Sequence, residues 1–180
     1  GSCNINAAGQ QWGNVVNAVQ QYLVSNGYSP QIKAYGGSDM EAAWDCPIPT
    51  RSFVDGFNSN DPSSAYFVDY GTGYWGTSCY QNQTAWSKDD VRYVAYGATH
   101  DYPLPEIYSV GNVSTWQSVG TPMYFLGSFD DCSLADEITA ANCGTNNYTP
   151  NTAWDALWAY ASTIQSTLQY STNLKGQGSP

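Results

Sequence analysis

Basic side chains are scarce in this sequence of 180 residues. Five Lys and Arg stand against fifteen Asp and Glu, so the net charge at pH 7 is -10. A surface with this charge repels nucleic-acid phosphates and anionic membranes, and we therefore predict no nucleic-acid partner. Only 11% of the residues are charged, and the abundant neutral polar side chains are common on secreted proteins.

Long apolar runs are also absent. No stretch approaches the roughly 20 residues that a membrane-spanning helix needs, and no signal peptide is recognisable. We expect no membrane insertion, and we interpret the sequence as a mature extracellular chain from which a leader has been removed. The apolar content of 42% can form one sizeable core, so we predict a single domain over residues 1–180.

Residues that usually bind metals are few. Histidine occurs once, as His100, and no C-x-x-C pair is present. A zinc site is therefore not expected, and a lone histidine without a serine or cysteine nucleophile motif does not make a catalytic triad. We predict neither a metal site nor a cofactor.

The five cysteines are widely spaced, which favours disulfides formed in an oxidising compartment. The pair that we favour is Cys132 with Cys143, which would close a short polar loop. The odd count leaves one thiol that is free, bonded to another chain, or bonded to a part of the protein outside this sequence. The other three are Cys3, Cys46 and Cys79.

Helical periodicity marks several segments. Residues 8–26 form a predicted amphipathic helix that ends at Asn26-Gly27. Ser87 with Asp90 resembles the capped start of a second helix, and Thr149 with Pro150 starts the last one. Shorter helices are predicted near residues 53–57 and 114–119. The apolar face of the first helix consists of Trp12, Val15, Val16, Val19 and Leu23, and we assign the helical tryptophans Trp12, Trp154 and Trp158 to the core.

Four short apolar runs are predicted strands, at residues 32–36, 66–70, 104–108 and 123–126. Their alternation with helices favours an α/β fold with a parallel sheet and right-handed crossovers, either an open sandwich or a barrel. A complete eight-unit barrel needs about 250 residues. A barrel here would therefore be incomplete, and loops, a partner chain or a missing segment would have to cover its open edge.

Acidic residues cluster where these strands end. Asp39 and Glu41 follow the first strand, Asp69 lies near the end of the second, and Glu106 lies within the third. Proteins with parallel sheets build their sites at the carboxyl ends of the strands. We therefore expect an acidic cleft formed by these side chains. Two more acids, Asp130 and Asp131, follow the fourth strand.

Several segments together resemble one family. They are 37–44 (GSDMEAAW), 53–57 (FVDGF), 66–71 (YFVDYG), 96–98 (YGA), 103–108 (PLPEIY), 122–125 (PMYF) and 148–154 (YTPNTAW). In these motifs the chain resembles the later part of secreted bacterial proteins with a glycoside-hydrolase-like barrel, distantly similar to lysozyme-type muramidases. The resemblance covers nearly the whole chain and implies a TIM-barrel-like fold that is truncated or incomplete. Most members of this group have no demonstrated activity.

Glycosidases use two carboxyl groups, one protonated as an acid and one ionised as a nucleophile or base. Glu106 has apolar neighbours, Pro105 and Ile107, which would raise its pKa and suit it as the general acid. Glu41 or Asp39 is then the candidate partner, with Asp69 as a third polar group. The alternative is that these acids bind loop amides or cap helices.

Aromatic residues near the same end of the predicted sheet offer flat apolar surfaces on which sugar rings stack. The alternative for each ring is packing within a loop. These candidate substrate-binding residues are Trp44, Tyr70, Tyr74, Trp75 and Tyr108.

Two functions remain. The first is an extracellular glycan-active protein that hydrolyses glycosidic bonds in a polysaccharide or peptidoglycan through a carboxylate pair. The second is a non-catalytic secreted surface or structural protein that binds glycan or self-assembles on a degenerate barrel. The clustered acids favour the first function, whereas the short chain and the odd cysteine favour the second.

Overall fold

The computed structural model describes residues 4–42, 45–59, 66–76, 79, 85–98, 100–120, 122–129 and 148–172. Within these residues, helices alternate with short parallel strands. The helices are α1 (Ile5–Ser25), α2 (Pro47–Ser59), α3 (Lys88–Tyr96), α4 (Val110–Val119) and α6 (Pro150–Ala161). The strands are β1 (Tyr35–Ser38), β2 (Tyr66–Asp69), β3 (Asp101–Pro103), β4 (Gly127–Phe129) and β5 (Tyr170–Thr172).

Helix ends follow the signals in the sequence. The Asp90 N–H donates to Ser87 Oγ, and the Asp90 carboxylate accepts from the Ser87 N–H, which is the predicted capping box of α3. Thr149 caps α6, with Pro150 at its first position. Gly27 follows α1 with a φ of 74°, which glycine adopts at little cost. These three predictions are confirmed.

Glycines set how α1 packs on α2. A Cβ added at Gly9 would lie 2.0 Å from the carbonyl oxygen of Phe53, and one added at Gly56 would lie 2.0 Å from the carbonyl oxygen of Asn6. A Cβ at Gly13 would lie 2.9 Å from the backbone of Phe57. The two helix backbones therefore approach so closely that only glycine fits between them.

This packing corrects the predicted face of α1. Val16 and Leu23 are buried as expected, but Trp12, Val15 and Val19 are 36%, 50% and 46% exposed. The assignment of Trp12 to the core is therefore wrong. The physical reason is that the glycine face of the helix, rather than its most apolar stripe, packs against α2.

The sheet is parallel but forms no barrel, so the barrel prediction is wrong. Strands β1, β2 and β3 form a three-stranded sheet in that order, and β4 pairs with β5 in a separate two-stranded sheet. The two sheets are linked by one parallel bridge between Glu106 and Phe129. No described strand has more than four residues, and the prolines Pro103 and Pro105 lack the N–H that a longer third strand would need.

Three of the strands are displaced from their predicted positions. β1 begins at Tyr35 instead of residue 32, β3 lies before the predicted 104–108, and β4 lies after the predicted 123–126. β2 starts where predicted and ends one residue earlier. Asp130 and Asp131 are outside the described residues.

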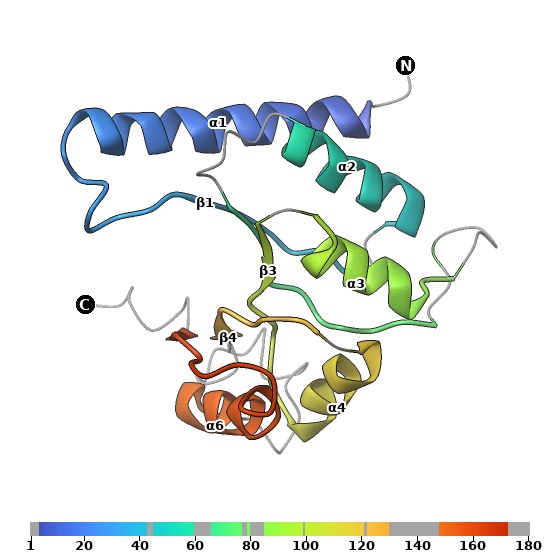
Figure 1. Ribbon diagram of the computed structural model, residues 1–180. Coiled ribbons are helices and arrows are strands. Elements are labelled where there is room, and N and C mark those ends of the chain that lie inside the picture. The colour runs from blue at the N-terminus through green and yellow to red at the C-terminus, as the bar shows by residue number, and fades with distance from the viewer. Residues whose placement is uncertain are drawn as a thin grey trace, which may run out of the picture.

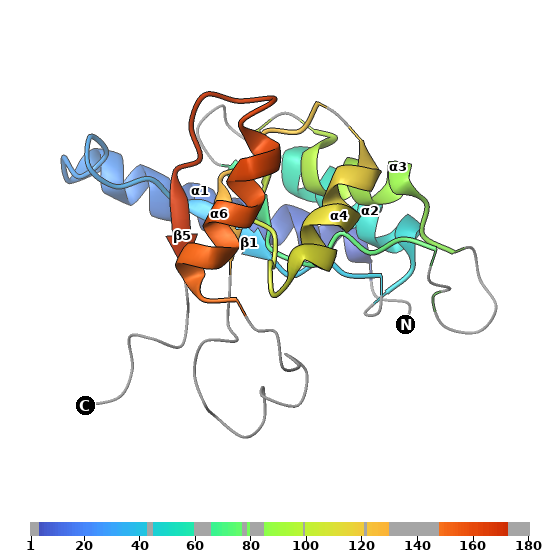
Figure 2. The same cartoon turned by 90° about the horizontal axis from the view of Figure 1, so that it is seen from below.

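The helices form layers on the sheets. Figure 1 shows α1 and α2 together over one side of β1 to β3, with α3 beside them and α4 and α6 at the other end of the molecule near β4. Figure 2 shows β5 running beside α6. Trp154 and Trp158, which were assigned to the core, are half-buried and stack with ring centroids 5.6 Å apart. The core between these layers includes Val54, Phe57, Phe67, Val94, Ile107, Trp116, Met123 and Leu157.

One disulfide lies within the described residues. Cys46, just before α2, is bonded to Cys79, 33 residues later in the sequence. A disulfide is compatible with a secreted protein. The favoured pair Cys132 and Cys143 lies outside the described residues. Among the described helices, none is both long and apolar enough to span a membrane.

Candidate functional site

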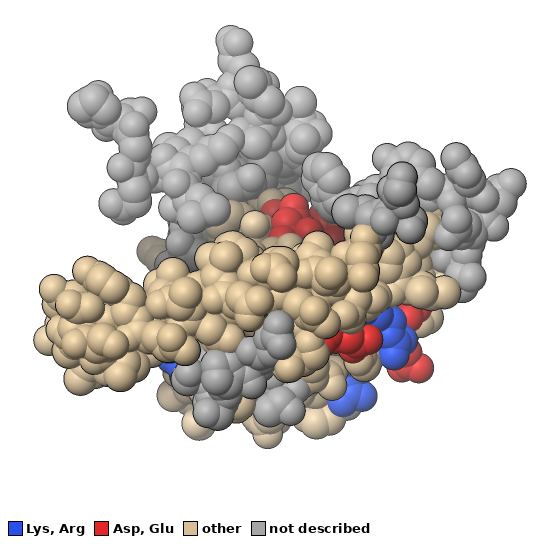
Figure 3. Space-filling view, turned by 90° about the horizontal axis from the view of Figure 1, so that it is seen from above, with Lys and Arg blue, Asp and Glu red and all other residues tan. Residues whose placement is uncertain are grey.

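The carboxyl ends of β1, β2 and β3 bring four acids to one edge of the sheet. In the strand register, Ser38 at the end of β1 lies opposite Asp69, and Asp69 lies opposite Pro103 at the end of β3. The chain continues from these ends to the remaining acids of the set. We call Asp39, Glu41, Asp69 and Glu106 the acidic cluster. Figure 3 shows a concentrated patch of acidic side chains set back from the surrounding surface.

Asp69 is the most buried member of the acidic cluster, with 1% of its surface exposed. Its Oδ1 accepts hydrogen bonds from the N–H groups of Gly71 at 3.0 Å and Met40 at 3.3 Å. Burial raises the pKa of Asp69 to about 8, and the charges of Asp39 and Glu41 act in the same direction. The two N–H donors lower this pKa but do not offset the burial. Asp69 is therefore mainly protonated at neutral pH.

Tyr70, which directly follows Asp69, lies near the acidic cluster. Burial raises the pKa of its phenol, and the charges of Asp39, Asp69 and Glu106 raise it further. Its ring lies 5.9 Å from the ring of Phe129, measured between centroids. Tyr70 is thus neutral and half-buried, and the charges of three of the four acids raise its pKa.

The loop after β2 is held by the acidic cluster. The Thr72 N–H donates to Glu41 Oε1 at 3.1 Å, and the Glu106 N–H donates to the Gly71 carbonyl at 3.3 Å. A Cβ added at Gly71 would lie 2.7 Å from the Met40 carbonyl oxygen, so the loops after β1 and β2 are in direct backbone contact. Glu41 and Asp69 therefore bind loop amides, which is the alternative role that the sequence left open for them.

Two of the predicted sugar-binding rings lie in a second hollow. Tyr74 and Trp75 are 51% and 42% exposed. The Trp75 indole N–H donates to Ser118 Oγ of α4 at 2.8 Å, and Lys88 Nζ lies 4.5 Å from the centroid of the Trp75 ring. The hollow has a volume of about 340 Å³ and is lined by Tyr74, Trp75, Ser114, Thr115 and Ser118.

The remaining predicted rings are Tyr108 and Trp44. Tyr108 is half-buried and follows Glu106 by two residues, and its carbonyl accepts a hydrogen bond from the Tyr148 N–H at 3.2 Å. Trp44 lies outside the described residues. Tyr70 is the predicted ring whose pKa the acids are shown to raise.

In the part of the chain that the structure describes, no three His, Cys, Asp or Glu side chains are placed to hold a metal ion. The carboxyl groups are near enough to influence one pKa but are not arranged as ligands. A carboxyl group that keeps its proton beside other carboxyl groups is suited to acid and base chemistry.

Comparisons with models of protein families, with curated protein sequences and with solved structures find no match. The resemblance to glycoside-hydrolase-like proteins therefore stays an expectation from the sequence.

The sequence reasoning missed a larger cavity at the opposite, amino ends of the strands. It has a volume of about 500 Å³, and tyrosines supply much of its wall. The available signal was a tyrosine at the first residue of two neighbouring strands, Tyr35 of β1 and Tyr66 of β2. We call this feature the tyrosine cavity; its lining includes Lys33, Tyr35, Tyr66, Tyr102, Tyr124 and Gln165.

Proposed function

We propose that this chain is an extracellular glycan-active protein and that its acidic cluster hydrolyses glycosidic bonds in a polysaccharide or peptidoglycan. The observation that carries the proposal is the buried Asp69, whose pKa of about 8 lies among other carboxyl groups at the carboxyl ends of parallel strands. Glycosidases need carboxyl groups that differ in protonation at one pH. The Cys46–Cys79 disulfide supports the extracellular location.

The roles follow from exposure. Asp69 is too buried to meet a substrate, so we assign it as a positioning residue that fixes the loops after β1 and β2. Glu106 is half-buried and is the proposed general acid. It gives its proton to the leaving glycosidic oxygen, while water adds to the anomeric carbon and loses a proton to Glu41 or Asp39.

A neutral Asp69 also limits charge repulsion in the acidic cluster. If Asp69 ionised, a further negative charge would lie beside Asp39 and Glu41 in a poorly solvated setting, which is unfavourable. Activity should therefore fall as the pH rises through about 8. Asp69→Asn should weaken this alkaline fall, whereas a merely structural role would leave the pH at which it occurs unchanged.

The test compares variants of the full chain on peptidoglycan and on a panel of β-linked glycans. Glu106→Gln should lower the release of reducing ends by about 10²- to 10⁴-fold, and Asp155→Asn on the exposed surface of α6 is the matched control. Melting temperatures of both variants show whether the fold is kept. Equal rates for the wild type and Glu106→Gln would exclude Glu106 as the acid.

A non-catalytic glycan-binding role is the second candidate. It is favoured by the hydrogen bonds from loop amides to Glu41 and Asp69, because acids that fix loops need no catalytic function. Under this role no variant and no wild-type protein would release reducing ends, although glycan would still bind. The self-association expected from the sequence stays a prediction that light scattering tests.

A further inference from the structure

The tyrosine cavity is built by the residues that start the strands. Tyr35 and Tyr66 open β1 and β2 and lie opposite each other in the register, with ring centroids 5.4 Å apart. Tyr66 and Tyr102 have centroids 5.5 Å apart. Because Tyr102 pairs with Val68, two residues after Tyr66, these tyrosines share one face of the sheet. Helices α1 and α2 cover the other face.

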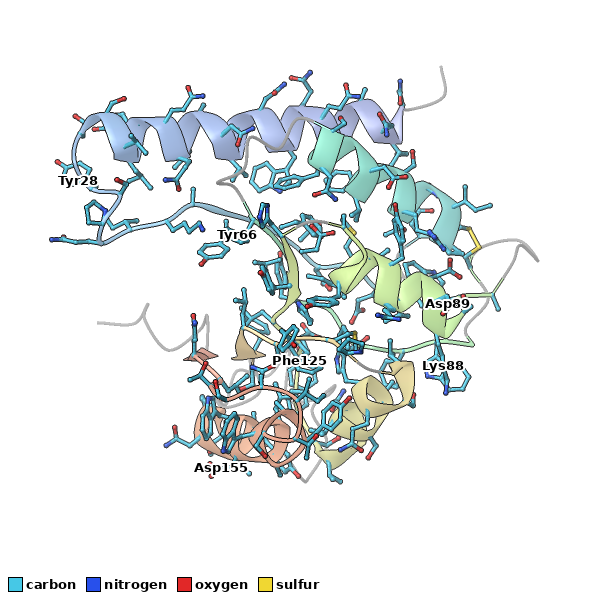
Figure 4. All side chains as sticks on the ribbon, viewed as in Figure 1. Tyr28, Tyr66, Lys88, Asp89, Phe125 and Asp155 are labelled. Atoms are coloured by element: carbon cyan, nitrogen blue, oxygen red, sulfur yellow. A yellow bond between two sulfur atoms is a disulfide. The ribbon has the colours of Figure 1, made fainter. Side chains whose placement is uncertain are left out.

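The opposite wall is fixed by two hydrogen bonds between the Gln165 side chain and the Phe125 backbone. The Phe125 N–H donates to the Gln165 side-chain oxygen at 2.7 Å, and the Gln165 side-chain amide donates to the Phe125 carbonyl at 2.9 Å. This pair joins the segment before β4 to the segment before β5. Figure 4 labels Tyr66 and Phe125, which line the cavity from these two sides. The cavity is therefore formed before a ligand arrives, which lowers the entropic cost of binding.

Polar groups rule out a purely apolar ligand. Besides the tyrosine hydroxyls, the wall carries the side chains of Ser166, Thr167 and Gln169. An apolar ligand would leave such donors and acceptors without water or a partner, which costs binding energy. Flat rings combined with hydroxyl and amide groups suit a sugar, whose ring has an apolar face and a polar rim.

The charged residue in the cavity lining indicates which kind of sugar the cavity binds. Lys33 lines it, with Nζ 3.3 Å from the centroid of the Tyr66 ring, and none of its described lining residues is acidic. The chain as a whole carries a net charge of -10, and the acidic cluster lies at the other end of the strands. Lys33 therefore gives the wall of the tyrosine cavity a positive charge, which is complementary to an anionic ligand.

We propose that the tyrosine cavity binds a saccharide that carries a carboxylate, with the sugar ring against the tyrosines and the carboxylate at Lys33. The volume of about 500 Å³ is in the range of sites for small ligands. This site is separate from the acidic cluster, so the proposal does not depend on hydrolysis. The tyrosine cavity is then a second glycan-binding site of the chain, and its ligand is an acidic glycan.

The test is isothermal titration of the full chain with trigalacturonate and, as its uncharged counterpart, galactotriose. Trigalacturonate should bind more tightly, and added salt should weaken its binding. Lys33→Gln should weaken it roughly 10- to 100-fold, because a hydrogen bond to a charged group is lost. Lys33→Arg should keep most of the affinity. Tyr124→Ala should weaken both ligands by up to about tenfold.

Two matched controls lie outside the cavity. Lys88→Gln removes a lysine that also contacts an aromatic ring, and Tyr22→Ala removes an exposed tyrosine of α1. Neither should change binding, and circular dichroism should show that every variant keeps its helices. Absence of trigalacturonate binding, equal affinity for both trisaccharides, or loss of binding in Lys88→Gln but not in Lys33→Gln would each overturn the proposal. The titration measures binding without any hydrolysis, so failure of the hydrolysis test would leave its result unaffected.

Discussion

The two ends of the parallel strands carry opposite chemistry. At the carboxyl ends, the acidic cluster surrounds a buried Asp69 and a half-buried Tyr70. At the amino ends, tyrosine rings and Lys33 line a cavity that has no acid among its described walls. A short parallel sheet can therefore present two different surfaces, because the loops at its two ends leave in different directions and differ in composition.

The two ends also differ in how tightly they are built. Around the acidic cluster, glycines such as Gly71 let backbones touch, and loop amides bind the carboxylates. Around the tyrosine cavity, the centroids of neighbouring tyrosine rings lie 5.4 and 5.5 Å apart, and open space remains beside the rings. The first arrangement can fix the protonation of a buried group, and the second can admit a ligand.

The largest expected effect is on catalysis at the carboxyl ends. Glu106→Gln should lower glycan hydrolysis by about 10²- to 10⁴-fold, because the amide cannot donate a proton to the leaving oxygen. Lys33→Gln at the amino ends should leave the rate on an uncharged glycan unchanged. Reducing-sugar assays measure both. If the lysine variant lost as much activity as the glutamate variant, the two ends would not be separate sites.

A large effect on stability is expected from pH. Folded Asp69 keeps its proton up to about pH 8, whereas the unfolded chain loses it near 3.8. Between these values the unfolded state binds fewer protons, so this group makes stability fall as pH rises, by up to about 1.4 kcal/mol per pH unit. Asp69→Asn should make the fall shallower.

Urea unfolding at several pH values from 4 to 8 measures this slope. Asp155→Asn, on the exposed surface of α6, is the control and should keep the wild-type slope. An unchanged slope in Asp69→Asn would mean that another group causes the pH dependence. The contrast between a buried, protonated Asp69 at one end of the sheet and the Lys33 ammonium group at the other end would then no longer hold.

A smaller effect is expected from the close packing at the carboxyl ends. Gly71→Ala should lower the free energy of unfolding by about 1–3 kcal/mol, because its methyl group would meet the rigid Met40 backbone. Gly111→Ala in the first turn of α4 is the control, since the added methyl would meet only the side chain of Ser109 at 3.3 Å. Chemical denaturation measures both. Equal stability of the two variants would show that the loops have room to separate.

Local signals predicted the parts of the fold that depend on neighbouring residues. The capped starts of α3 and α6 and the strand ending at Asp69 follow from residue types a few positions apart. The face of α1 was mispredicted because hydrophobic periodicity gives no weight to Gly9 and Gly13, although glycine allows the closest helix contact. The barrel was mispredicted because strand alternation does not state how many strands pair.

The candidate site was predictable in position but not in electrostatics. Counting from strand ends placed the acids together, since parallel strands end at the same edge. Tertiary contacts bury Asp69 and raise its pKa strongly, which its neighbours in the sequence did not indicate. The raised pKa expected at Glu106 stays a prediction. The tyrosine cavity escaped prediction because its walls come from five separate segments of the chain.

The most direct measurement is a titration of the Asp69 side-chain carboxyl by ¹³C NMR, with Asp69→Asn used to assign the signal. The central claim is that the buried Asp69 keeps its proton at neutral pH. We predict that its chemical shift changes near pH 8, well above the ordinary value of 3.8. A single change near pH 4 would contradict the claim, because Asp69 would then be ionised at neutral pH.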